Sequence, residues 1–323
     1  MKINFVGNFG PSGSGEIADE IHIARSFEEL GHTVQRIPRD IWREVCNGKW
    51  ETNWEGQQPL ENSDINIIAK WDKFEDGKYI KHLKFFTEAP VFYWCWDSVD
   101  LNIDWHRRMA QSADLYLSGE LGRANEFRKH NIRFYYFQFD CVDGTIEIEH
   151  DQEKLYDVVY LGTYDNQSGR MDILKEINKE IPIEVWGNGD WSNNGFITHP
   201  AVFGKDANRI IAQSKIVLGT SCDPHLFGYW SNRVGRVLRA GGSLLQQYTP
   251  GMESFLHDYA EYFSNPQEAI SKIRLHLANY NPHESLYSSE NADTFTSQQK
   301  AKDLTILMKR YLIENNGKDW LLP

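Results

Sequence analysis

The chain has 323 residues, of which 41% are hydrophobic and 25% charged, and its formal net charge is −12. This length predicts two domains, because a single hydrophobic core rarely grows beyond about 250 to 300 residues. The acidic balance argues against a broad nucleic-acid surface, which depends on Lys and Arg to neutralise phosphates, although a local basic groove stays open.

No stretch approaches the roughly 18 apolar residues that a membrane helix needs, so we expect no membrane span. The sequence passes from Met1 directly into an apolar run, without the pattern of a secretion signal, and we therefore expect a cytoplasmic protein. The cysteines lack the close Cys or His spacing of a zinc site. We therefore expect free, mostly buried thiols at Cys46, Cys95, Cys141 and Cys222.

Short apolar runs alternate with helical patterns through both halves, which is typical of parallel α/β layers. In the first half we expect strands at 2–6, 33–37, 65–69, 91–94, 115–118 and 134–137. Residues 17–30 have apolar side chains at helical spacing and are followed by Gly31, which suits a helix end.

The polar, acidic segment 141–153 predicts the domain junction, which gives domains at 1–145 and 154–323. In the second half we expect strands at 157–161, 183–186, 216–218, 243–246 and 261–263. The tail is expected to be helical at 267–280 and 295–314, and its last helix is a candidate to pack back on the first domain.

A glycine-rich loop follows the first strand and opens the first helix. Glycine lets the backbone approach a ligand closely, and free N–H groups at a helix start favour anions. A dinucleotide fingerprint fits only loosely, because Pro11 interrupts it and no acidic residue ends the second strand near Arg36. A tight turn without a ligand stays open. We favour a loop facing an interdomain cleft, with its amides near donor phosphates or the acceptor, at Gly10, Ser12, Gly13, Ser14 and Gly15.

Two expected strands of the second half end in small residues. In open α/β sheets ligands bind at the carboxyl ends of the strands, which places Gly162, Thr163 and Arg170 for binding. The turn after 183–186 contains two glycines and two indoles. It suits a nucleobase, held by backbone hydrogen bonds and stacking, or simply a tight loop. Its candidate residues are Trp186, Gly187, Asn188 and Gly189.

The stretch 227–245 is the most informative. Ser231 and Asn232 suit a helix N-cap, where the helix start offers amides to a diphosphate. Arg233 adds a charge with fork geometry suited to phosphate, and a surface pair with a carboxylate is the alternative. Glu253, in the following loop, can accept hydrogen bonds from sugar or ribose hydroxyls.

These runs resemble the C-terminal donor domain of CgeB-like glycosyltransferases. The resemblance covers about residues 157–277 and rests on GYWSNR at 228–233, GGSLL at 241–245 and YTPGME at 248–253, with 205–218 fitting the preceding helix and strand. It implies a GT-B fold, in which two Rossmann-like domains face a cleft. It also implies a nucleotide-sugar donor, with a UDP-sugar expected, and no metal ion or further cofactor. Many relatives carry a glutamate that holds the ribose where this chain has Arg236.

Glycosyl transfer needs a stabilised leaving diphosphate and, in an inverting enzyme, a base for the acceptor hydroxyl. For the diphosphate we expect Arg170, Lys205 and Arg233. For the base we expect Asp97, which ends an apolar strand of the first domain; a helix cap is the alternative reading. Retention of configuration stays open, and the weaker competitors for the base are Glu88, Glu120 and Asp140.

The first domain, 1–145, is the one in which we expect the acceptor to bind. It is rich in tryptophans that can stack on a sugar, a base or an aglycone: Trp42, Trp50, Trp54, Trp71, Trp94 and Trp96. A glycan, a protein and a hydroxymethylated base in DNA are the candidate acceptors. Two rival functions stay open, a sugar-nucleotide epimerase and a non-catalytic module that binds a nucleotide sugar.

Overall fold

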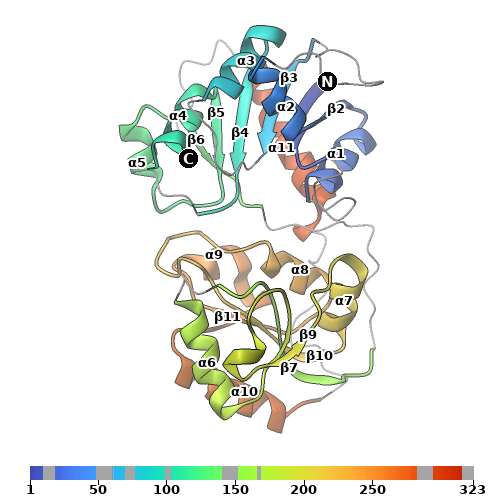
Figure 1. The fold of residues 1–323 in the computed structure, drawn as a ribbon, viewed down its shortest axis with the longest axis vertical. Helices are drawn as coiled ribbons and strands as arrows, with labels where there is room; N and C mark the ends of the chain where they lie inside the picture. Colours follow the sequence, from blue (N-terminus) through green and yellow to red (C-terminus); the bar gives the residue numbers. More distant parts are fainter. Residues whose placement is uncertain are drawn as a thin grey trace. The chain divides into compact units, whose positions relative to one another are not determined.

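The computed structural model describes residues 1–9, 19–48, 60, 62–69, 77–98, 103–139, 152–165, 169–281 and 294–314. The chain divides into two compact units. The N-terminal unit contains Met1–Phe139 together with Ser297–Pro323, and the C-terminal unit contains Asp140–Thr296. Each unit is built on one six-stranded sheet (Figure 1).

The sheet of the N-terminal unit has the strand order β2-β1-β3-β4-β5-β6, and all its neighbouring strands are parallel. Its strands are β1 (Lys2–Gly7), β2 (Thr33–Pro38), β3 (Ile65–Ala69), β4 (Val91–Cys95), β5 (Leu115–Ser118) and β6 (Phe134–Tyr136). Every residue of β3, β4 and β5 is buried, as expected where helices cover both faces of a parallel sheet. The helices are α1 (Asp19–Glu29), α2 (Arg39–Cys46), α3 (Lys78–Thr87), α4 (Asp104–Ser112), α5 (Ala124–Lys129) and α11 (Ser297–Ile313).

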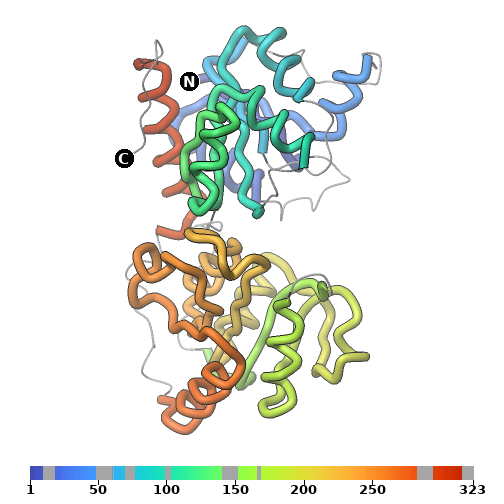
Figure 2. The backbone as a smooth tube through the Cα atoms, turned by 90° about the vertical axis from the view of Figure 1, so that its left-hand side faces the viewer, coloured from blue at the N-terminus to red at the C-terminus, as the bar shows by residue number. Residues whose placement is uncertain are grey.

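The C-terminal helix α11 packs against α1 in the N-terminal unit, where Figures 1 and 2 draw it in red. Ser26 Oγ donates a hydrogen bond to Ser297 Oγ over 3.1 Å. The rings of Phe92 and Tyr311 meet edge to face, with their centroids 5.1 Å apart. The end of the chain therefore helps to cover the sheet formed by its beginning.

The sheet of the C-terminal unit has the order β12-β11-β10-β7-β8-β9 and is also parallel throughout. Its strands are β7 (Tyr156–Leu161), β8 (Glu184–Trp186), β9 (Ile197–His199), β10 (Ser214–Gly219), β11 (Leu244–Gln247) and β12 (Glu261–Phe263). Its α-helices are α6 (Arg170–Glu180), α7 (Gly204–Ala212), α8 (Arg233–Arg239), α9 (Met252–Leu256) and α10 (Pro266–Ala278), and two 3₁₀ turns are η2 (Ser192–Asn194) and η3 (His257–Tyr259).

The two faces of this second sheet carry separate hydrophobic clusters. On one face Tyr160 of β7 packs with residues of α6 and α10. On the other face its neighbour Val159 packs with residues of α7, α8 and α9. Consecutive residues of a strand point to opposite faces, so this division fixes the side on which each β7 side chain lies.

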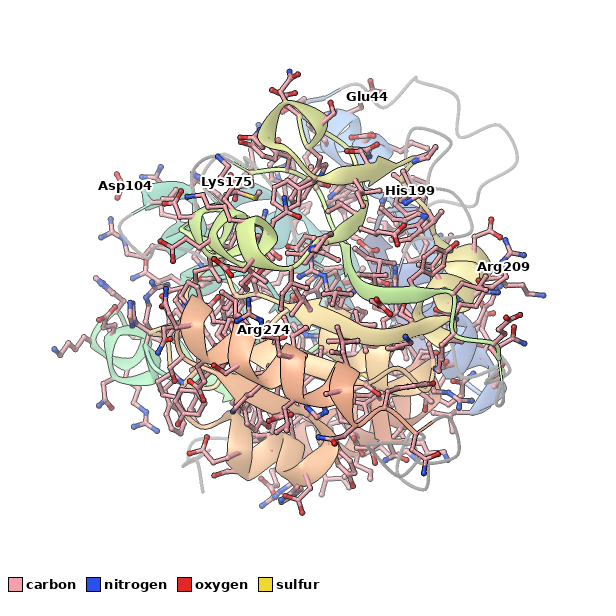
Figure 3. The ribbon with its side chains drawn as sticks, turned by 90° about the horizontal axis from the view of Figure 1, so that it is seen from below. Glu44, Asp104, Lys175, His199, Arg209 and Arg274 are labelled. Atoms are coloured by element: carbon pink, nitrogen blue, oxygen red, sulfur yellow. The ribbon has the colours of Figure 1, made fainter. Side chains whose placement is uncertain are left out.

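All eleven strands expected from the sequence are present, and the expected α/β class with two Rossmann-like units is confirmed. The sequence prediction missed β9, which pairs with β8 at the edge of the sheet. Its residues are exposed or half-buried, so they carry no buried apolar pattern that marks a strand. Charged side chains such as Arg209 and Arg274 are exposed on the C-terminal unit (Figure 3).

Candidate functional site

The C-terminal sheet has a topological switch point between β7 and β10. From β7 the chain proceeds outward to β8 and β9, and it then returns to place β10 on the other side of β7. In open α/β sheets such a point leaves a crevice at the carboxyl ends of the strands, where ligands bind. Gly162 follows β7 and Thr220 follows β10 at this edge.

The loops after β7 and β8 are joined backbone to backbone. Gly162 N–H donates to Trp186 O over 3.1 Å, and Tyr164 N–H donates to Asn188 O over 2.8 Å. A side chain at position 187 would overlap the carbonyl oxygen of Gly162. Glycine at 187 is therefore required by this close approach, and the structure brings Gly162 and Gly187 together.

Arg233, the first residue of α8, extends its side chain to the end of β7. Its guanidinium carbon lies 4.7 Å from the centroid of the Tyr160 ring, which is a cation–π contact. A Cβ atom at position 162 would lie 2.7 Å from Arg233 Nη2. The guanidinium therefore occupies the space that a side chain at 162 would fill.

The half-buried Arg233 forms no ion pair with any residue whose position the structure describes. The other arginine expected to bind phosphate differs, because Arg170 Nη2 lies 3.1 Å from Asp165 Oδ2. Taking a guanidinium partly out of water without an anion is unfavourable, so Arg233 is suited to receive an anionic ligand.

The helix start next to Arg233 contributes less than the sequence suggests. Asn232 is the N-cap residue of α8, but its side chain forms no capping hydrogen bond. Ser231 accepts the Val234 N–H through its backbone carbonyl, over 3.1 Å. The helix has only seven residues, so the charge on Arg233 matters more than the helix dipole.

Arg170 lies in a pocket of about 380 Å³ at the carboxyl ends of β10, β11 and β12. It is the first residue of α6, and its Nη1 donates to Cys222 Sγ over 3.2 Å. The polar residues of this pocket can bind hydroxyl and phosphate groups of a small ligand. They are Arg170, Ser221, His225, Gln247, Tyr248 and Ser264.

Glu253 lies in a neighbouring hollow of about 640 Å³ that shares Tyr248 and Ser264 with the first pocket. The hydroxyl of Tyr248 donates to Glu253 Oε1 over 3.2 Å. Burial, followed by the hydrogen bond and charge of Glu253, raises the pKa of Tyr248. The structure therefore does not bring Glu253 into the pocket that Arg170 lines.

The remaining C-terminal candidates either take part in packing and turns or are exposed. The indole of Trp186 stacks on His199, with centroids 4.1 Å apart and planes 9° from parallel. His199 Nε2 is in turn 2.8 Å from Glu184 Oε2. Gly189 has a φ of 100°, which favours glycine. Thr163, Asn188 and Lys205 are exposed.

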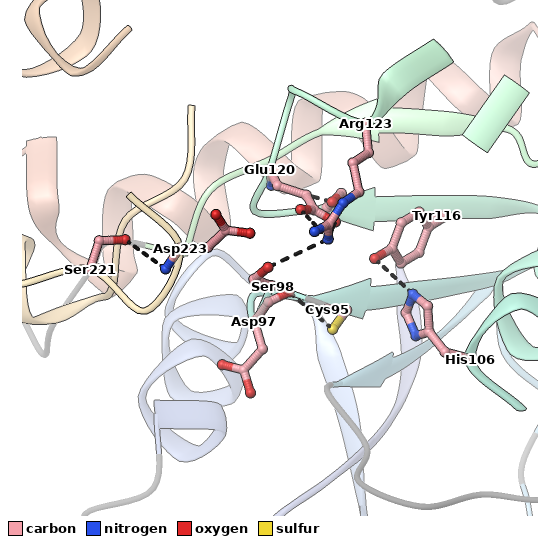
Figure 4. A network of polar contacts seen from close by, with 10 residues as sticks. Cys95, Asp97, Ser98, His106, Tyr116, Glu120, Arg123, Ser221 and Asp223 are labelled. Carbon is pink, nitrogen blue, oxygen red and sulfur yellow. Dashed lines mark hydrogen bonds and ion pairs between the residues drawn. The ribbon is translucent and has the colours of Figure 1, made fainter. Parts of the chain in front are cut away.

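In the N-terminal unit, Asp97 follows β4 and is half-buried. Its backbone carbonyl accepts a weak hydrogen bond from Cys95 Sγ over 3.8 Å. Glu120 follows the neighbouring strand β5 and is fully buried, with its Oε2 3.1 Å from Arg123 Nη1. In Figure 4 the carboxylate of Asp97 points away from the Glu120–Arg123 pair.

Glu88 lies at the other end of β4 from Asp97, because it follows α3 and comes just before the strand begins. It has a φ of 54° and ends the helix through its backbone. Gly10, Ser12, Gly13, Ser14 and Gly15 of the glycine loop lie outside the described residues, as do Asp140, Cys141, Trp50, Trp54 and Trp71.

Sequence reasoning missed one buried carboxyl group. Glu20 on α1 is 6% exposed and packs at the carboxyl end of β1, where its Cγ would lie 3.0 Å from a Cβ at Gly7. Asn8 N–H donates to its Oε1 over 3.4 Å, and burial raises the pKa of Glu20. The signal was present, because Glu20 lies three residues from Ile23, four from Ala24 and seven from Phe27, on the apolar face of the helix.

A family model described as glycosyl transferase-like matches residues 170–302. The resemblance to CgeB-like enzymes inferred from the motifs is thereby confirmed for this part of the chain. No curated protein sequence matches the chain.

Solved structures share the fold of the whole chain. Sucrose-phosphate synthase from Thermosynechococcus elongatus aligns with a TM-score of 0.65 at 9% identity, covering 97% of this chain and 99% of that protein. A DNA-modifying β-glucosyltransferase, studied with and without uridine diphosphoglucose, aligns at 0.59 and 12%, covering 98% of each chain. HepE of Anabaena, in complex with UDP-glucose, aligns at 0.63 and 12%, covering 96% and 100%.

These likenesses show the fold, which is two parallel six-stranded sheets with helices, as in GT-B structures. No helix within the described ranges is long and apolar enough to cross a membrane. The same residues contain no group of three His, Cys, Asp or Glu side chains that could hold a metal ion.

Proposed function

We propose that this chain transfers a sugar from a nucleotide-sugar donor to a hydroxyl group of an acceptor, and that it does so without a metal ion. The observation that carries this proposal is Arg233. It is half-buried at the switch point of the sheet, stacked on Tyr160, and without an acidic partner in the part of the chain that the structure describes. The match of residues 170–302 to a glycosyl transferase-like family model supports this reaction class.

Arg233 supplies the chemistry that the leaving group needs. When the bond between the anomeric carbon and the diphosphate oxygen breaks, negative charge grows on the diphosphate. A guanidinium already held at that point stabilises the charge, and its fork of N–H groups matches two phosphate oxygens. The work of a divalent cation is then done by a side chain, which supports a metal-independent mechanism.

The pocket around Arg170 extends the same binding edge. It begins at Ser221, the residue after Thr220, and Thr220 is hydrogen-bonded to Tyr160 beneath Arg233. Hydroxyls, an amide and an imidazole line it, and these groups suit the polar parts of a nucleotide sugar. We assign the donor to Arg233, Gly162, Gly187 and this pocket, and a UDP-sugar is the first donor to test.

Asp97 is the proposed base for the acceptor hydroxyl, because it lies two residues after β4, at the carboxyl end of a strand of the N-terminal sheet. A carboxylate there can take the hydroxyl proton as the oxygen attacks the anomeric carbon. A glycan, a protein and a hydroxymethylated base in DNA remain the candidate acceptors. A hexose or a pentose is the transferred group.

The experiment is a thermal-shift screen of the purified chain against UDP-, GDP-, dTDP- and CDP-sugars. A ligand at one hundred times its dissociation constant stabilises the folded state by about 2.7 kcal/mol, so the matching donor should raise the melting temperature by several degrees. A chain that none of these donors stabilises would contradict the proposal.

Turnover of the matching donor separates the rival functions. A transferase should slowly hydrolyse the donor to free sugar and nucleoside diphosphate, and this hydrolysis should survive EDTA. A module would bind the donor and leave it intact. An epimerase would convert the donor into a second nucleotide sugar with no acceptor present.

A further inference from the structure

Arg233 reaches around the end of the sheet. It belongs to α8, which packs on the face that holds Val159, whereas the ring of Tyr160 lies with α6 and α10 on the opposite face. The contact of 4.7 Å between the guanidinium carbon and the Tyr160 ring centroid is therefore made across the carboxyl end of β7. The packing of α8 on its own face of the sheet does not require the Arg233 side chain to cross to the ring of Tyr160.

The path is open because residue 162 is glycine. A Cβ there would lie 2.7 Å from Arg233 Nη2 and 2.9 Å from Cε1 of Tyr160, both closer than real Cβ atoms approach their neighbours. Gly162 does not have a positive φ, so its backbone does not require glycine. What requires glycine is the space taken by the guanidinium and by the edge of the Tyr160 ring.

The ring beneath the guanidinium is itself fixed. Tyr160 is fully buried, and its hydroxyl lies 3.2 Å from Thr220 Oγ1 on the neighbouring strand end. Its ring also packs on Trp191, with centroids 5.5 Å apart. A buried ring held on two sides cannot turn away, so it offers the cation one constant face.

We infer that Tyr160 and Gly162 are positioning residues, which hold the guanidinium of Arg233 in the orientation that grips the donor diphosphate. This inference rests on the proposed function. Stacking uses one face of the planar guanidinium and leaves its N–H groups, which lie in the plane, free for phosphate oxygens. A flexible arginine would lose side-chain entropy when the diphosphate binds, and the seat formed by Tyr160 and Gly162 removes part of that cost beforehand.

The test compares three variants at this seat by calorimetry with UDP-glucose and UDP, or with the matching pair if the screen selects another donor. Gly162→Ala should displace the guanidinium, which is the movable end of a side chain, and weaken both ligands about tenfold. Tyr160→Leu removes the ring face and should weaken them similarly. Tyr160→Phe keeps the face, loses only the hydroxyl bond to Thr220, and should bind nearly as wild type does.

Two further measurements separate positioning from general damage. Phe196→Leu is the control, because Phe196 is a buried aromatic residue of the same cluster as Tyr160 and lies in the segment before β9. It should lower the melting temperature and leave affinity unchanged. In the Arg233→Ala background, Gly162→Ala should cause no further loss of affinity, because the group that it displaces is gone.

The outcomes distinguish this inference from the proposed function. If wild type binds a donor and Arg233→Ala weakens it, but Gly162→Ala and Tyr160→Leu bind as wild type does, the seat is refuted and the function stands. If Gly162→Ala weakens binding equally with and without Arg233, the seat is also refuted. If wild type binds no donor, the proposed function itself fails. Should Tyr160→Leu not fold, Gly162→Ala and the double variant decide the matter.

Discussion

The guanidinium of Arg170 donates a hydrogen bond to the thiol of Cys222, with 3.2 Å between Nη1 and Sγ. Both residues line the pocket of about 380 Å³ that we assign to the donor, and Cys222 is exposed. A bound nucleotide sugar should therefore cover this thiol. We predict that saturating donor slows alkylation of Cys222 by iodoacetamide at least severalfold, measured by peptide mass spectrometry over time.

The same protein supplies the control for this experiment. Cys46 and Cys95 are buried, so their slow labelling should not respond to the donor unless the fold itself opens. If the labelling rate of Cys222 is the same with and without bound donor, the donor does not occupy this pocket.

Asp97→Asn should leave donor affinity intact and lower transfer about 100-fold or more, because a general base contributes roughly 10² to 10⁴ in rate. Initial rates with the identified acceptor measure the loss of transfer, and calorimetry measures the affinity for the donor. Glu88→Gln is the matched control, since Glu88 lies at the opposite end of the same strand and should keep full activity. Normal turnover by Asp97→Asn would exclude Asp97 as the base and make Glu120 and Asp140 the next candidates to test.

Glu20→Gln should stabilise the protein at neutral pH. Burial raises the folded-state pKa of Glu20 above 4.5, so the stability linked to this group is present below pH 4.5 and is lost as pH rises through the folded pKa. Glutamine keeps the shape of the side chain and its acceptor for Asn8 N–H, but it carries no charge. Urea unfolding should show a higher free energy of unfolding for Glu20→Gln than for wild type at pH 7. This difference should be smaller at pH 4.5.

The exposed Glu126→Gln is the control for that comparison and should change stability little. A Glu20→Gln protein that is less stable than wild type at pH 7 would mean that the charged carboxylate is needed in the fold.

His106 should make the N-terminal unit sensitive to acid. Its ring is fully buried, and the hydroxyls of Tyr93 and Tyr116 each lie 3.3 Å from one of its ring nitrogens. Figure 4 shows the contact with Tyr116. Burial lowers the pKa of His106 to about 4. A folded pKa below the unfolded value of about 6.5 gives stability that is present above pH 6.5 and is lost as pH falls towards 4, by up to about 3 kcal/mol.

Urea unfolding between pH 7 and pH 4.5 measures this loss. His106→Gln should be less stable than wild type at pH 7, and the difference should narrow as pH falls. The half-buried His130→Gln, at the end of α5, serves as the control. An equal pH dependence of wild type and His106→Gln would show that His106 does not titrate on unfolding.

The strands were predictable because their signal is local. Runs such as VFYWC at 91–95 are apolar throughout and are bounded by turn residues, so they indicate buried parallel strands directly. β9 has no such run, and it forms because β8 offers a free edge beside it. The candidate loops were predictable for the same reason, since strand order puts Gly162 and Gly187 at one edge of the sheet.

The contacts within the site were not predictable from the sequence. Whether Arg233 pairs with a carboxylate depends on which acidic residues the fold brings near it, and no local pattern records this. From the sequence, Trp186 is an aromatic ring near two glycines and available to a ligand. In the structure, His199 of β9 stacks on it. Since β9 was missed, its contact with Trp186 was missed as well. The seat of Arg233 combines residues 160 and 162 with residue 233, which lies far from both in the sequence.

Arg233→Ala tests the central claim most directly. Isothermal titration of wild type and this variant with the donor selected by the screen should show a loss of about 10- to 100-fold or more in affinity, because charge-assisted hydrogen bonds are each worth roughly 1.5 to 3 kcal/mol. Arg209→Ala, which removes an exposed arginine paired with Asp206, should bind as wild type does. Equal donor affinity for Arg233→Ala and wild type would contradict the account.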